Sequence, residues 1–118
     1  MNNKVLVVGE SKVILMIYSA IFESEGYKHE AAENATECIE KINKTEFGVV
    51  ILNVEEPLLD GIETLKNIKS CQPNLPVIVT SMCRDEEFAS DVLKNGAYRF
   101  IAKPFETTTM AKILGEML

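Results

Sequence analysis

Short apolar runs alternate with longer amphipathic stretches along this 118-residue chain. Five of the runs have the length and composition of β-strands. They lie at residues 4–8, 27–32, 48–53, 76–80 and 98–102. The third and fourth runs are almost wholly apolar, which predicts strands buried on both faces. The second run is more polar, so it is expected at an edge of the sheet.

Each apolar run is followed by a stretch with the periodicity of an amphipathic helix. The predicted helices cover residues 12–25, 34–44, 60–71, 85–96 and 106–117. Ser11 is expected to cap the first helix, and Asn34 with Glu37 has the spacing of a capping box for the second. Asp60 with Glu63 has the same spacing, so the third helix is expected to begin there.

Five consecutive strand–helix units predict an α/β fold, a doubly wound parallel sheet with helices on both faces. The chain length fits a single domain over residues 1–118. In such sheets the functional crevice lies at the carboxyl ends of the strands. The residues at those ends are Gly9, Glu10, Asn53, Thr80, Ser81 and Lys103. The topology therefore predicts that an acid, an amide, two hydroxyls and an ammonium group lie close together.

The net charge of −6 and the isoelectric point near 4.8 argue against binding of nucleic acid or an anionic membrane, because phosphate contacts need clustered Lys and Arg. No apolar run approaches the length of a membrane span, and the first residues are too polar for a signal peptide. Cys38, Cys71 and Cys83 form neither a CxxC pair nor an even set. These observations favour a reducing, cytoplasmic location.

Four segments stand in a distinctive order and spacing: VLVVGES, VVILNVEEPLLDGIE, PVIVTS and GAYRFIAKPF. With them the chain strongly resembles the receiver domains of two-component response regulators, from residue 4 to residue 105 and into the last helix. The most specific landmarks are Pro57, Asp60-Gly61 and Lys103-Pro104. The resemblance implies a flavodoxin-like (βα)5 fold with strand order 2-1-3-4-5. It also implies a cis peptide bond between Lys103 and Pro104.

The resemblance assigns a role to each position at the carboxyl ends of the strands. The family's acidic pair falls on Gly9 and Glu10, and its phosphoacceptor aspartate falls on Asn53. Thr80 matches the hydroxyl that contacts a phosphoryl oxygen, and Lys103 matches the cation that pairs with it. The resemblance thus implies a degenerate site in which the phosphoacceptor and one of the two acids are missing.

Thr80 and Phe100 match the family's switch pair, in which the aromatic ring swings inward when the hydroxyl is drawn to the phosphoryl group. Simpler roles stay open for both residues: Thr80 as a hydrogen-bonding residue before the next helix, and Phe100 as part of the core. Nothing covalent can drive the switch here. The pair is therefore expected in one dominant arrangement, fixed by packing or biased by a partner.

The carboxamide of Asn53 changes the chemistry that the site supports. It carries no negative charge, so it cannot form the family's acyl phosphate. Mg²⁺ prefers oxygen ligands that include carboxylates, and its candidates are Glu10, Asn53 and the carbonyl of Glu55. Binding of Mg²⁺ is expected to be weak or absent, and no other cofactor is expected. The charges of Glu10 and Lys103 cancel, so these two are expected to form a salt bridge.

Two surfaces are candidates for protein contacts. In the first predicted helix, the residues expected to face the core recur at spacings of three and four. They are Ile14, Ile17, Tyr18, Ile21 and Phe22. Met16 falls on the opposite face, where the resemblance places docking of a phosphodonor protein. Lys94 and Arg99 lie on the second surface, formed by the fourth helix, fifth strand and fifth helix, through which a homodimer could form.

The leading interpretation is a pseudo-receiver, which is not an enzyme but a phosphorylation-independent regulatory and interaction module of two-component signalling. Its partner would be a histidine kinase, an output domain or another signalling protein. A second interpretation is a working receiver that is modified at Ser81, Thr80 or Ser11, or that keeps weak metal or phosphate binding. A third, a flavodoxin-like cofactor binder, lacks the phosphate loop that it needs after the first strand.

Overall fold

The computed structural model describes residues 4–118. Residues 1–3, which contribute to the expectation of no signal peptide, lie outside the described residues. The strands are β1 (Val5–Val8), β2 (His29–Ala32), β3 (Val49–Val54), β4 (Val77–Ser81) and β5 (Arg99–Ala102). The helices are α1 (Lys12–Ser24), α2 (Ala35–Lys44), α3 (Leu58–Cys71), α4 (Glu86–Lys94) and α5 (Thr107–Met117). Within the described residues, every helix is too short or too polar to cross a lipid bilayer.

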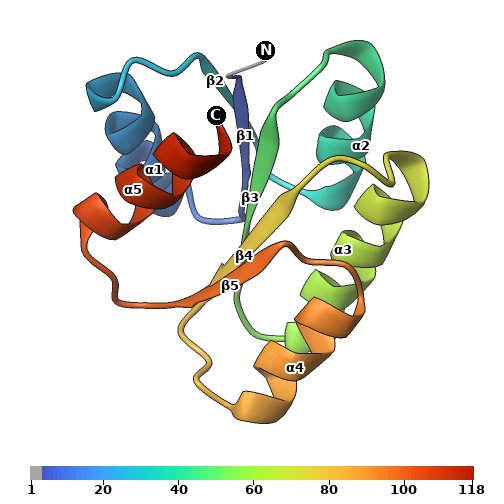
Figure 1. Cartoon of the computed structure of the whole chain (residues 1–118). Coiled ribbons are helices and arrows are strands. Elements are labelled where there is room, and N and C mark those ends of the chain that lie inside the picture. Colours follow the sequence, from blue (N-terminus) through green and yellow to red (C-terminus); the bar gives the residue numbers. More distant parts are fainter. Residues whose placement is uncertain (1–3) are drawn as a thin grey trace.

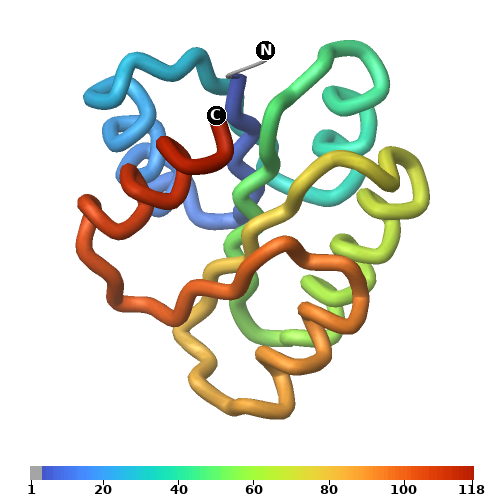
Figure 2. The backbone as a smooth tube through the Cα atoms, in the orientation of Figure 1, coloured from blue at the N-terminus to red at the C-terminus, as the bar shows by residue number. Residues whose placement is uncertain are grey.

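The strands form one parallel sheet in the order β2-β1-β3-β4-β5, which confirms the predicted topology. Helices α1 and α5 cover one face, and α2, α3 and α4 cover the other (Figure 1). The polar strand β2 lies at an edge, as predicted. The loops that follow β3 and β4 lie side by side at the lower end of the sheet (Figure 2).

Alternation along β3 divides the core between the two faces. Val50, Leu52 and Val54 pack in the cluster with α2, α3 and α4, whereas Val49 and Ile51 pack in the cluster with α1 and α5. Successive side chains of a strand point to opposite faces. The next odd-numbered position therefore points toward α1 and α5, at the carboxyl end of the strand.

Helix starts follow the predicted capping residues at α1 and α2. The Ser11 side chain accepts a hydrogen bond from the amide of Ile14, and the Asn34 side chain accepts one from the amide of Glu37. Asp85 caps α4 in the same way. The prediction for α3 is wrong, because that helix already begins at Leu58.

Pro57 precedes the first turn of α3, and its fixed φ suits an extended residue just before a helix. The carboxylate of Asp60 consequently lies in the first turn, where the helix dipole favours a negative charge, rather than at the cap. One residue later, Gly61 permits a close approach of α3 to β3. A Cβ at Gly61 would overlap both methyl groups of Val54.

The predicted core face of α1 is correct in part. Tyr18, Ile21 and Phe22 are buried, but Ile17 is 49% exposed and Leu15 is buried in its place. The cause is that residues 13–17 are all apolar, so two helical stripes offset by about one residue fit the pattern equally well. Packing against the sheet selects the stripe that contains Leu15.

Candidate functional site

The sheet register places Asn53 beside Thr80 at the carboxyl ends of β3 and β4. Asn53 is 6% exposed and Thr80 is fully buried. Lys103 follows β5, and its backbone amide donates to the carbonyl of Ser81 at 2.8 Å. The structure therefore brings together the amide of Asn53, the hydroxyl of Thr80 and the ammonium group of Lys103, as the topology predicted, whereas the Ser81 hydroxyl accepts a hydrogen bond from the amide of Cys83 instead.

Two donors converge on Oδ1 of Asn53, and a third hydroxyl lies close by. Lys103 Nζ donates to it at 2.9 Å and Thr80 Oγ1 donates to it at 3.1 Å. The hydroxyl of Tyr18 lies at 3.5 Å from the same oxygen and at 2.9 Å from Thr80 Oγ1. These four residues, Asn53, Lys103, Thr80 and Tyr18, are called the amide network below. A neutral carboxamide oxygen therefore accepts the hydrogen bond of a lysine that is only 8% exposed.

The amide network fixes the orientation of the Asn53 side chain. A flipped amide would turn its NH₂ group toward the Lys103 ammonium, where donor would face donor. In the observed orientation Nδ2 is buried, and it has no hydrogen-bond partner within residues 4–118. A Cβ at Gly9 would lie 3.8 Å from Nδ2, so the glycine leaves this side of the amide without an acceptor. An unpaired buried donor of this kind costs about 1–3 kcal/mol.

The periodicity of the first helix predicts Tyr18 in the core stripe and gives it no role at the site. Its ring is buried and lies 5.9 Å from the ring of Phe105, between centroids. Burial raises the pKa of the Tyr18 phenol above its usual value of 10.0, and the charge of Glu55 raises it further, while the hydrogen bond with Thr80 lowers it. A hydroxyl group in an otherwise apolar stripe is the signal that could have identified Tyr18, because a buried phenol usually finds a polar partner.

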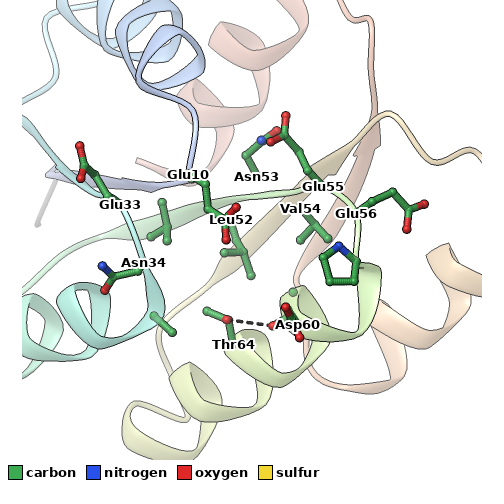
Figure 3. Close-up of a pocket in the computed structure, with 15 residues that line it drawn as sticks. Glu10, Glu33, Asn34, Leu52, Asn53, Val54, Glu55, Glu56, Asp60 and Thr64 are labelled. Carbon is green, nitrogen blue, oxygen red and sulfur yellow. Dashed lines mark hydrogen bonds between the residues drawn. The ribbon is translucent and has the colours of Figure 1, made fainter.

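The predicted salt bridge between Glu10 and Lys103 is wrong. None of the ion pairs among residues 4–118 contains either residue, and Lys103 Nζ is bonded to Asn53 instead. Glu10 is exposed and lines a small pocket of about 70 Å³ between the loops after β1, β2 and β3. In Figure 3 the Glu10 side chain extends toward the side of β3 on which Asp60 lies, and Asn53 points to the other side.

The pocket is bordered by exposed carboxylates from these loops and the start of α3. They are Glu10, Glu33, Glu55, Glu56 and Asp60, called the acidic rim below. Within residues 4–118, no three carboxylate, imidazole or thiol groups converge as a metal site would require.

The residues present do not fit Mg²⁺. Asn53 Oδ1 already accepts hydrogen bonds from Lys103 and Thr80, and Nδ2 is a donor that cannot bind a cation. Gly9 supplies no side-chain ligand. Mg²⁺ needs near-ideal octahedral oxygen ligands, usually with one or two carboxylates directly bound, and the donors around Asn53 do not provide them.

Comparison with known proteins identifies the fold family. A family model described as "Response regulator receiver domain" matches residues 5–115. This chain belongs to the response regulator receiver domain family. The receiver NtrX from Brucella abortus superposes with a TM-score of 0.90 at 30% identity, over all of this chain and 27% of that one. The chemotaxis protein CheY4 of Vibrio cholerae superposes with a TM-score of 0.88 at 28% identity, over the whole of both chains.

Curated relatives include short and long receiver proteins. Chemotaxis protein CheY of Thermotoga maritima is 28% identical over 118 residues, which cover 99% of this chain and 98% of that protein. Sporulation initiation phosphotransferase F of Bacillus subtilis is 30% identical over 106 residues, which cover 90% of this chain and 86% of that protein. The chain spans only 26% of the transcriptional regulatory protein ZraR of Klebsiella oxytoca, at 31% identity over 114 residues.

Receiver domains are regulatory modules of two-component signalling that interact with histidine kinases and other signalling proteins. In this receiver, two hydrogen bonds from residues after Ser81 hold the loop between β4 and α4. Arg84 donates to the carbonyl of Lys103 at 3.0 Å, and the amide of Cys83 donates to Ser81 Oγ at 3.1 Å. The peptide bond between Lys103 and Pro104 is cis, as predicted.

The two residues predicted to form a switch pair, Thr80 and Phe100, lie on opposite faces of the sheet. Thr80 belongs to the amide network, whereas Phe100 is half-buried against the cluster with α4, where its ring meets that of Phe88 edge to face at 5.8 Å. Phe100 thus packs with the core in this structure. Thr80 is bonded inside the site rather than to the start of α4, which is capped by Asp85.

The two predicted contact surfaces of the receiver are both solvent-exposed. On α1, Met16 is 71% exposed and is flanked by exposed Val13 and Ile17. At the other surface, Lys94 and Arg99 are exposed. Two large apolar residues next to them in the chain, Leu93 and Tyr98, are exposed as well.

Proposed function

We propose that this receiver is a protein-interaction and regulatory module whose signalling state does not depend on phosphorylation at residue 53. The observation that carries the proposal is the hydrogen bonding of Asn53. Its carboxamide oxygen already satisfies Lys103 at 2.9 Å and Thr80 at 3.1 Å, two groups that the resemblance assigns to a phosphoryl group. A neutral amide thus takes the place of the charged modification as their partner.

The chemistry of the side chain supports the same proposal. An aspartyl phosphate forms when a carboxylate oxygen attacks phosphorus, and a carboxamide is a poor nucleophile that yields no acyl phosphate. The position that corresponds to the first acid of the family is Gly9, so a second part of the phosphotransfer apparatus is also missing. Mg²⁺ binding at Glu10, Asn53 and the carbonyl of Glu55 is accordingly proposed to be weak or absent.

The hydroxyl groups near the site are engaged in the structure. Ser11 and Ser81 each accept a hydrogen bond from a backbone amide, and Thr80 donates to Asn53. A phosphoryl acceptor needs a base to remove its proton. The alternative, in which one of these hydroxyls is a substitute acceptor, is therefore an outcome of the following test rather than a second proposal.

The test is incubation with acetyl phosphate and Mg²⁺, followed by intact-mass measurement and peptide mapping. Chemotaxis protein CheY of Thermotoga maritima is treated in parallel as a family control. We expect no base-labile adduct on this chain. A phosphoryl group mapped to Ser81, Thr80 or Ser11 would replace the proposal with a working receiver at a substitute acceptor.

The partner is proposed to be a histidine kinase, an output domain or a second copy of the chain. A glutamate introduced on one surface at a time separates the two candidate surfaces. Met16→Glu should abolish partner binding if α1 is the docking surface, and Arg99→Glu should do so if the surface is α4, β5 and α5. Sedimentation of wild type and Arg99→Glu tests the homodimer, which is contradicted if wild type is a monomer at all concentrations measured.

A further inference from the structure

The hydroxyl of Tyr18 is placed to control the Thr80 side chain. It reaches from α1 across the core to β4 and lies 2.9 Å from Thr80 Oγ1, although the two residues are 62 positions apart in the chain. Both groups are buried, so neither has bulk water as an alternative partner. A buried hydroxyl pair of this kind stays hydrogen-bonded because leaving either group unpaired in the core would cost free energy.

The number of hydroxyl hydrogens determines which group donates in this contact. Thr80 and Tyr18 each carry one hydroxyl hydrogen, and Lys103 donates to Asn53 in any arrangement. If Thr80 donates to Asn53 at 3.1 Å, the Tyr18 hydrogen goes to Thr80 at 2.9 Å. The reverse order would send the Tyr18 hydrogen to Asn53 at 3.5 Å, which is outside the usual range. The chain of donors therefore runs from Tyr18 to Thr80 to Asn53.

We infer that Tyr18 is the positioning residue that holds the Thr80 hydroxyl turned toward Asn53. The inference deepens the proposed function, on which it rests, because it names what sets this side chain when no phosphoryl group is attached. The Tyr18 phenol positions the Thr80 side chain through a hydrogen bond inside the core. The Tyr18 ring is itself fixed by its contact with Phe105 and by burial under α1.

The first test reads the rotamer of Thr80 directly. Three-bond couplings to the Thr80 methyl group are measured by NMR in wild type and in Tyr18→Phe, without phosphodonor or partner. Wild type should show one rotamer. The variant should show averaged couplings, with about a fivefold change in the rotamer ratio, the shift that one typical hydrogen bond produces. Unchanged couplings would overturn the inference.

A matched control uses another tyrosine of the same core. Tyr27 is half-buried against the cluster that contains Tyr18. Tyr27→Phe removes a hydroxyl of the same kind away from Thr80, so the Thr80 couplings should stay as in wild type. If both variants change them equally, the effect is general loosening of the core and the inference fails.

The second test approaches the pair from the other side and does not need Tyr18→Phe to fold. Thr80→Val removes the hydroxyl with little change of shape, and Thr80→Ser keeps it. When Tyr18 ionises, the Thr80 hydroxyl can turn and donate to the phenolate, and this is how the bond with Thr80 lowers the pKa of Tyr18. Thr80→Val should therefore raise that pKa, and Thr80→Ser should leave it near the wild-type value. The charges nearest the phenol, Glu55 and Lys103, are the same in all three proteins. Identical titration of Tyr18 in Thr80→Val and wild type would overturn the inference.

These measurements separate this inference from the proposed function. A phosphoryl adduct formed with acetyl phosphate would contradict the proposed function. The Thr80 couplings, which are measured without phosphodonor, would still test the role of Tyr18. If the Thr80 couplings are the same in Tyr18→Phe as in wild type, and wild type forms no adduct, the role of Tyr18 is excluded and the proposed function stands.

Discussion

The amide network and the acidic rim lie at the same end of β3 but differ in almost every physical respect. In the network, buried groups surround one oxygen, and hydrogen bonds with neighbouring side chains fix the position of each group. In the rim, five exposed carboxylates surround a small pocket and are free to be hydrated. Asn53 of the network and Asp60 of the rim lie on opposite sides of strand β3, and Glu55 is the rim residue that extends to the side of Asn53 (Figure 3).

The difference shows why the residues at one end of a sheet need not act together. Topology brings the loops to the same end, but alternation along a strand decides which face a side chain reaches. Glu10 extends toward the rim and Lys103 reaches the network, so their charges do not meet. Buried polar groups should accordingly be sensitive to substitution, and rim charges should tolerate it.

The largest effect is expected from the packing that supports the rim side. In Gly61→Ala, the added methyl group overlaps Val54 on β3, and α3 must move away from the sheet. We expect a loss of about 2–3 kcal/mol in the free energy of unfolding, measured by urea denaturation. Gly115→Ala on α5 is the control, because its Cβ would meet nothing within 4 Å; it should be neutral or slightly stabilising. Equal stability of the two variants would contradict the close approach.

The next largest effect is expected inside the amide network. Asn53→Leu keeps the number and branching of the side-chain heavy atoms but removes the acceptor of the buried Lys103 ammonium, which should cost about 2 kcal/mol of unfolding free energy. Glu56→Gln on the rim is the matched control and should change stability by less than about 0.5 kcal/mol. The contrast between network and rim fails if the two variants are equally stable.

A smaller effect of opposite sign is expected from Gly9→Asp. The new Cβ would lie 3.4 Å from Asn53 Cβ, an ordinary contact, and the carboxylate beyond it can reach the unpaired Nδ2. The variant should be more stable by about 1 kcal/mol, because a buried donor gains its acceptor. In Gly9→Asp combined with Asn53→Leu this gain should vanish. Persistence of the gain in the double variant would show another cause.

The smallest expected effect is a slope of stability at alkaline pH. The unfolded chain releases the phenol proton near pH 10.0, whereas burial raises the pKa of Tyr18 in the folded state. Above pH 10 the folded state therefore binds more protons, and the free energy of unfolding falls as pH rises, by at most about 1.4 kcal/mol per pH unit. Tyr18→Phe should flatten this slope and Tyr27→Phe should keep it. Parallel slopes in wild type and Tyr18→Phe would contradict it.

The fold could be predicted almost completely, because strand length, apolar pattern and segment order all agree. Errors arose where several local patterns fit equally well. The apolar stretch before Tyr18 allowed two helical stripes, and only contact with the sheet decides between Leu15 and Ile17. The capping-box spacing of Asp60 competed with Pro57, whose backbone geometry starts α3 earlier.

The site could be predicted as a set of positions but not as a set of bonds. Strand ends identify Asn53, Thr80 and Lys103, whereas the partner of Lys103 depends on side-chain directions that the sequence does not encode locally. Tyr18 was missed because periodicity treats it as one apolar residue among others. Its hydroxyl becomes informative only when β4 is placed beside α1.

Helix α1 carries Tyr18 on its buried face and Met16 on its exposed face, so a movement of the helix at the surface also moves a side chain in the core. The Tyr18–Thr80 hydrogen bond of 2.9 Å is near the upper end of the range for hydroxyl pairs, about 2.5–3.0 Å. A displacement of the helix by about half an ångström would carry the phenol beyond that range. A partner that displaced α1 by binding to its outer surface would therefore release Thr80, so that a contact at the surface would change a hydrogen bond in the core.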